Sequence, residues 1–136
     1  MDTKRIVQVA LVITGVVNLG TGLWALFAPE SFFDALASEF DPYNVHFVHD
    51  IGAFMSGLGA TALLALVWTD GWSVALGGNA VAAVGHFASH LMDNDIGSSP
   101  GDPFGLLLFS ALLVGVLAKL RLGGAEGAGS GQSSGG

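Results

Sequence analysis

Four apolar stretches dominate the chain, at about residues 6–28, 44–68, 72–92 and 103–121. Each is long enough to cross the hydrocarbon core of a bilayer, which takes about 20 residues of α-helix. Hydrophobic residues make up 51% of the sequence and charged residues only 11%, a composition outside the range of soluble domains. The sequence therefore predicts an all-α integral membrane protein in which four helices form a bundle.

The first stretch has a second interpretation, as a cleaved secretory signal. Its apolar run is longer than the roughly 7–15 residues of a signal's central region, so we expect a helix that stays. Residues 1–122 are then one transmembrane domain. Residues 123–136 are rich in Gly and Ser, a composition typical of a flexible tail.

The basic residues set the orientation, because all of them lie near the two ends of the apolar region, at Lys4, Arg5, Lys119 and Arg121. Positive ends stay in the cytoplasm, so we expect a multi-pass protein of the cell membrane with both termini cytoplasmic. The acidic connections 29–43 and 93–102 then face outward. The net charge of −7 suggests a halophile.

Membrane lipids are the expected surroundings of such a chain. Nucleic acid is not an expected partner, because the sequence has no basic stripe to neutralise phosphates. A homo-oligomer or a place in a larger membrane complex stays open.

The first outer connection contains a short helix signal. Ser31-x-x-Asp34 resembles a capping box, and Phe32, Phe33 and Leu36 would give the helix an apolar face. A helix of this kind lies at the membrane interface. We therefore predict a short interfacial helix between the first two spans.

Two clusters of histidine and aspartate are the candidate site. The second stretch begins with one cluster and the third ends with the other: His46, His49 and Asp50, and His86, His90 and Asp93. The short turn at 69–71 makes these stretches antiparallel neighbours, and the common helical rise then puts both clusters at one depth. We expect His49 to face His90 near the outer leaflet.

Nitrogen and oxygen ligands of this kind suit zinc, iron, copper or manganese, and the chain has no cysteine to offer thiolate. The six residues therefore predict a shared metal site. A haem held by His49 and His90 is an alternative. A third interpretation is that the histidines and aspartates form hydrogen-bonded pairs that tie the two helices together.

Three classes of function follow from these interpretations. The first is a metal-dependent membrane enzyme that acts near a lipid-soluble substrate. The second is a haem- or metal-binding accessory subunit of a membrane complex, and the third is a small transporter or structural subunit. Whether the protein is an enzyme is not decided by these residues.

Small and polar residues predict how the helices pack. Ala53, Gly57 and Ala60 continue the histidine face of the second stretch, and small residues let membrane helices approach closely. Asn18 and Asn79 are polar positions inside apolar stretches. We favour a hydrogen bond between helices for them over a polar path to the site.

Two segments carry a family resemblance, Gly22-x-Trp24-x-Leu26-x-x-Pro29 and Asn44-x-His46-Phe47-x-x-Asp50-x-Gly52. They resemble small uncharacterised four-span prokaryotic membrane proteins that are DoxX-like in size and layout. The resemblance covers the first three predicted spans. It implies a four-helix fold and supplies no established activity.

Overall fold

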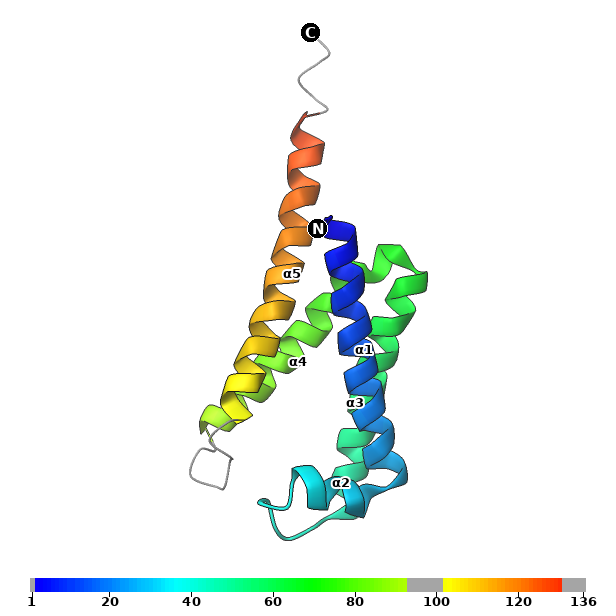
Figure 1. The fold of residues 1–136 in the computed structure, drawn as a ribbon, viewed down its shortest axis with the longest axis vertical. Coiled ribbons are helices and arrows are strands. Elements are labelled where there is room, and N and C mark those ends of the chain that lie inside the picture. Colours follow the sequence, from blue (N-terminus) through cyan, green and yellow to red (C-terminus); the bar gives the residue numbers. More distant parts are fainter. Residues whose placement is uncertain (1, 93–101, 131–136) are drawn as a thin grey trace.

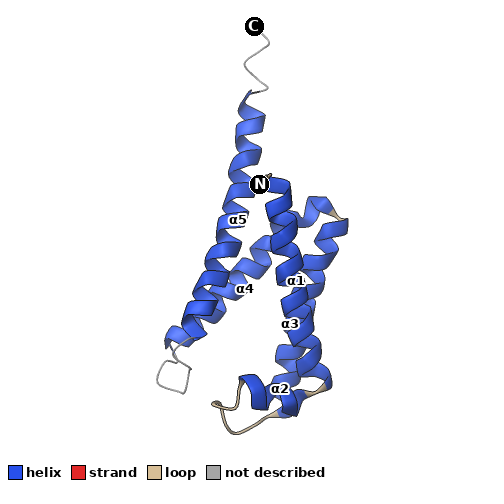
Figure 2. Cartoon of the chain, in the orientation of Figure 1, coloured by secondary structure: helices blue, strands red, loops and turns tan. Residues whose placement is uncertain are grey.

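The computed structural model describes residues 2–92 and 102–130. Within these ranges every element is helical (Figures 1 and 2), so the predicted all-α class is confirmed. The elements are α1 (Thr3–Phe27), α2 (Pro29–Leu36), α3 (Val45–Val67), the 3-10 turn η1 (Thr69–Gly71), α4 (Trp72–Met92) and α5 (Asp102–Ser130).

The helix ends follow from local chemistry. The side chain of Asn44 accepts hydrogen bonds from the backbone N–H groups of His46 (3.0 Å) and Phe47 (3.3 Å), which satisfies two free donors at the start of α3. At the other end of α3, the indole of Trp72 donates to the carbonyl of Ala65 at 2.8 Å. This bond spans η1 and holds the start of α4 against the end of α3.

The long helices form two pairs, in which α1 packs along α3 and α4 packs along α5 (Figure 1). Both pairs run between the same two ends of the molecule. The η1 end holds the start of α1 and the turn between α3 and α4, and the α2 end holds α2 and the start of α5. Helices α3 and α4 meet at η1 and diverge toward the α2 end.

Glycines explain why α1 and α3 pair so closely. A Cβ atom on Gly22 would lie 2.5 Å from the backbone nitrogen of Ser56, and one on Gly52 would lie 2.9 Å from the carbonyl of Gly22. The two backbones are therefore in contact with no room for side chains. Gly57, which we predicted on the packing face, is exposed and has open space around it. That prediction was wrong, because α3 turns its Gly52 face to α1.

The main core lies where all four long helices meet, in the half of the molecule near η1. Leu11 of α1, Leu76 of α4 and Leu113 of α5 are each 0% exposed and belong to one apolar cluster with Ala62 of α3. This cluster holds the two pairs together at one end. Continuous packing of four helices along their whole length is not what the structure shows.

Helix α2 covers the end of the α1–α3 pair. Phe32 and Phe33 are buried against Ala25 and Val48, so the predicted apolar face of this helix packs on the α1–α3 pair. Leu36 is 58% exposed. The helix starts before the predicted Ser31 because Pro29 already suits a first helical turn.

Three helical segments are long and apolar enough to cross a membrane: Thr3–Phe27, Val45–Val67 and Pro103–Leu122. Helix α4 has 21 residues but is less apolar, because Asn79, His86 and His90 interrupt it. Helix α5 continues to Ser130, past the residue at which the flexible tail is predicted to begin. The described residues thus support a membrane protein.

Candidate functional site

His86 and His90 form a pair near the end of α4. They are four residues apart, so they lie one turn apart on the same helix face. Their Nε2 atoms are 3.2 Å apart, and their ring centroids are 5.0 Å apart. At that separation one imidazole can donate a hydrogen bond to the other, and the same two nitrogens can also bind one cation.

A cavity of about 550 Å³ lies beside this pair, between the two helix pairs where they diverge. Its other walls are mostly apolar, with Phe32 from α2, Met55 from α3 and Leu106 from α5 among them. Thr21 also lines it, but its hydroxyl already donates to the carbonyl of Val17 at 2.7 Å. The two histidines are therefore the cavity's free polar groups among its described lining residues.

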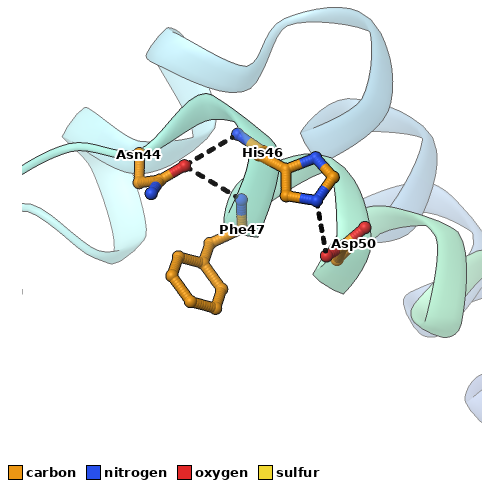
Figure 3. Close-up of polar contacts among 4 residues, drawn as sticks. All are labelled: Asn44, His46, Phe47 and Asp50. Atoms are coloured by element: carbon orange, nitrogen blue, oxygen red, sulfur yellow. Dashed lines mark hydrogen bonds and ion pairs between the residues drawn. The ribbon is translucent and has the colours of Figure 1, made fainter.

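His46 of α3 has a different setting (Figure 3). His46 Nε2 lies 3.6 Å from Asp50 Oδ2, and the two side chains are 84% and 52% exposed. An exposed pair of this kind contributes little to stability. His49 is partly buried and is not among the residues that line the cavity.

The six predicted ligands are thus placed as two separate pairs plus His49, and Asp93 lies outside the described residues. In the described ranges, 2–92 and 102–130, no three His, Asp or Glu side chains are grouped to hold one metal ion. Nor does a hydrogen bond or ion pair in these ranges join His49 to His90. The reason is that the three-residue turn holds α3 and α4 together only at η1. The two helices diverge from there toward the end that carries the histidines.

The cavity and its wall residues Ile51, Met55 and Gly105 were not predicted from the sequence. These residues are apolar or small, as lipid-facing residues also are, so hydropathy cannot separate a cavity wall from a lipid-facing surface. A signal that could have helped is Gly105, which leaves a gap on an otherwise bulky apolar face of α5.

The polar residues nearer η1 form a contact between helices, as expected. The side-chain amide of Asn18 donates to the Asn79 side-chain oxygen at 3.0 Å, and Asn79 donates in turn to the carbonyl of Ala75 at 3.0 Å. Thr14 is buried with no hydrogen-bond partner for its hydroxyl. These contacts support the packing interpretation over the polar path.

No protein-family model matches the chain, and neither a curated protein nor a solved structure matches it. The resemblance to DoxX-like proteins therefore stays a prediction. The geometry of the histidine pair and of the cavity is the basis for the proposed function.

Proposed function

We propose that this chain is a four-span membrane protein that binds a transition metal ion through His86 and His90. The observation that carries the proposal is the 3.2 Å separation of their Nε2 atoms. Two nitrogens bound to tetrahedral zinc at about 2.0–2.1 Å lie about 3.3–3.4 Å apart. The pair therefore needs only a small adjustment to chelate zinc, and iron, copper and manganese accept similar ligands.

One further ligand follows the pair in the sequence. Asp93 comes three residues after His90 and would supply a carboxylate. Water or a bound ligand would complete the coordination.

The path of the chain supports four spans, including α4. Helix α3 ends at the η1 end and α5 begins at the α2 end (Figure 1). If α3 and α5 both cross the bilayer, α4 must carry the chain back across it. Asn79 of α4 is only 2% exposed, so this polar side chain of the helix is kept away from lipid.

Charge supports an orientation with both termini in the cytoplasm. Lys4 and Arg5 begin α1 and Lys119 and Arg121 follow the apolar part of α5, all toward the η1 end, whereas α2 and the loop after it are acidic. Basic residues favour the cytoplasmic side. The histidine pair then lies in the outer half of the membrane.

A haem is a weaker alternative for this site. Its two axial ligands approach the iron from opposite sides of the ring, and neighbouring turns of one helix cannot do this. A metal-dependent enzyme is a second candidate function, because the apolar cavity beside the pair could hold a lipid-soluble substrate near the metal.

Metal binding can be tested by equilibrium dialysis of the purified protein against zinc, iron, copper and manganese, with metal content then measured by mass spectrometry. We expect His86→Ala and His90→Ala to lose more affinity than the roughly 10–100-fold typical of an outer-shell partner. His46→Ala is the matched control and should bind as the wild type does. The proposal would be overturned if the wild type bound none of the four metals. It would also be overturned if His46→Ala lost as much affinity as His86→Ala and His90→Ala.

A further inference from the structure

We infer that the cavity between the helix pairs binds a single-chain carboxylic acid, a free fatty acid, with its acid group at His86 and His90. The inference rests on the membrane placement in the proposed function and concerns the metal-free protein, in which the two Nε2 atoms bond to each other. It is carried by the size of the cavity, by its lining and by the hydrogen-bonding capacity of the histidine pair.

The size of the cavity suits one alkyl chain. Its volume of about 550 Å³ falls in the range of small-molecule sites, about 300–1,000 Å³, and leaves no room for the two chains of a phospholipid. Phe32, Ile51 and Met55 face α5 across it. Leu36 and Phe40 also line it while keeping 58% and 43% exposure, so they offer a route in from the surrounding bilayer.

The lining restricts the head group. None of the residues known to line the cavity is Asp, Glu, Lys or Arg, so a permanently charged head group would find no opposite charge there. A neutral carboxylic acid carries one donor and one acceptor. That combination distinguishes it from an ester or a hydrocarbon, which carries no donor.

The histidine pair complements this head group. In neutral imidazoles one ring nitrogen is a donor and the other an acceptor. When one Nε2 donates to the other across 3.2 Å, the accepting ring keeps an N–H and the donating ring keeps a free acceptor nitrogen. Both histidines line the cavity, so the pair offers one donor and one acceptor, the same combination that the acid group carries.

Two glycines of α5 allow a matched test. Gly105 lines the cavity and Gly115 does not, and a Cβ atom at either position meets nothing within 4 Å. Gly105→Phe should fill the cavity, whereas Gly115→Phe should add the same ring on a lipid-facing surface. Met55→Trp fills the cavity from the opposite wall and keeps the test valid if Gly105→Phe does not fold.

The probe is a palmitic acid analogue with a photoreactive group on its chain, added to phosphatidylcholine vesicles that contain the full-length protein. We expect Gly105→Phe and Met55→Trp to lower specific labelling by at least about tenfold, which corresponds to about 1.4 kcal/mol. Gly115→Phe should label as the wild type does. Unlabelled palmitic acid should compete at least about tenfold better than its methyl ester, since the ester leaves a polar group unpaired.

Labelling of both cavity-filling variants at the wild-type level would overturn the inference, as would equal competition by acid and ester. Metal binding measured by dialysis of the same variants separates this inference from the proposed metal site. Gly105→Phe should bind metal as the wild type does, while its metal-free form should lose the fatty acid. If the wild type binds no metal but shows the expected labelling, the metal proposal fails and this inference stands.

Discussion

Two hydrogen-bonded contacts between polar side chains of the described residues have different roles in this protein. Asn18 and Asn79 bond to each other across α1 and α4 near the core, where they join the two helix pairs. His86 and His90 bond within one helix beside a cavity, where they join nothing together. The asparagine contact has a packing role, because it joins two helices. The histidine contact has no packing role, and we therefore propose that the histidine pair binds a ligand.

Loss of the asparagine contact should destabilise the protein modestly. Asn18→Leu leaves the Asn79 oxygen without its partner, and bonds between membrane helices are worth about 0.6–2 kcal/mol. We expect a free energy of unfolding lower by about 1 kcal/mol in detergent. Asn18→Leu combined with Asn79→Leu should cost less than the sum of the single changes, because no amide stays unpaired. Strict additivity would show that the amides do not interact.

At the scale of helices, the pattern of apolar residues predicted which segments are helical. It did not predict which helices pack against each other. The bounds of α3 and α4 follow from the Asn44 cap and the short turn at η1, both of which are local. The partner of α3 depends on which small residues meet another backbone, and Gly52 and Gly57 are equally small in the sequence. The expectation that His49 faces His90 rested on the short turn and the common helical rise, which fix the relative depth of two helices but not the distance between them.

Helix pairing can be tested with two glycines of α3. A Cβ atom on Gly59 would lie 2.7 Å from the Leu19 Cα atom, whereas one on Gly57 meets open space. Gly59→Ala should therefore force α1 and α3 apart and cost about 1–3 kcal/mol. Gly57→Ala should change stability by less than about 1 kcal/mol, in the direction of helix propensity. Equal effects in a denaturant titration would contradict the α1–α3 contact.

At the scale of the whole molecule, two closely packed pairs share a core at the η1 end and separate at the α2 end. The helical class, the bounds of α3 and α4 and the position of the turn could be predicted from the sequence because each depends on hydropathy or capping. The end of α5 at Ser130 was not predicted. The separation of the pairs could not be predicted, since it depends on where Leu11, Leu76 and Leu113 converge in space. The cavity is a consequence of that separation.

The proposed four-span topology predicts which positions react with a membrane-impermeant maleimide on intact cells. The chain contains no cysteine, so single cysteines can be introduced without background. Ser38→Cys should react from outside, whereas Asp70→Cys and Leu122→Cys should react only after permeabilisation. Reaction of Asp70→Cys and Leu122→Cys on opposite sides would mean that α4 does not cross the membrane.

The number of imidazoles around the bound metal tests the central claim most directly, and X-ray absorption of the zinc-loaded protein measures it. We expect two imidazole ligands at about 2.0–2.1 Å, with oxygen ligands completing the shell. His46→Ala should leave that number unchanged, and His90→Ala should lower it to one or abolish binding. Zinc bound by three or more imidazoles, or by none, would contradict a site built on His86 and His90 alone.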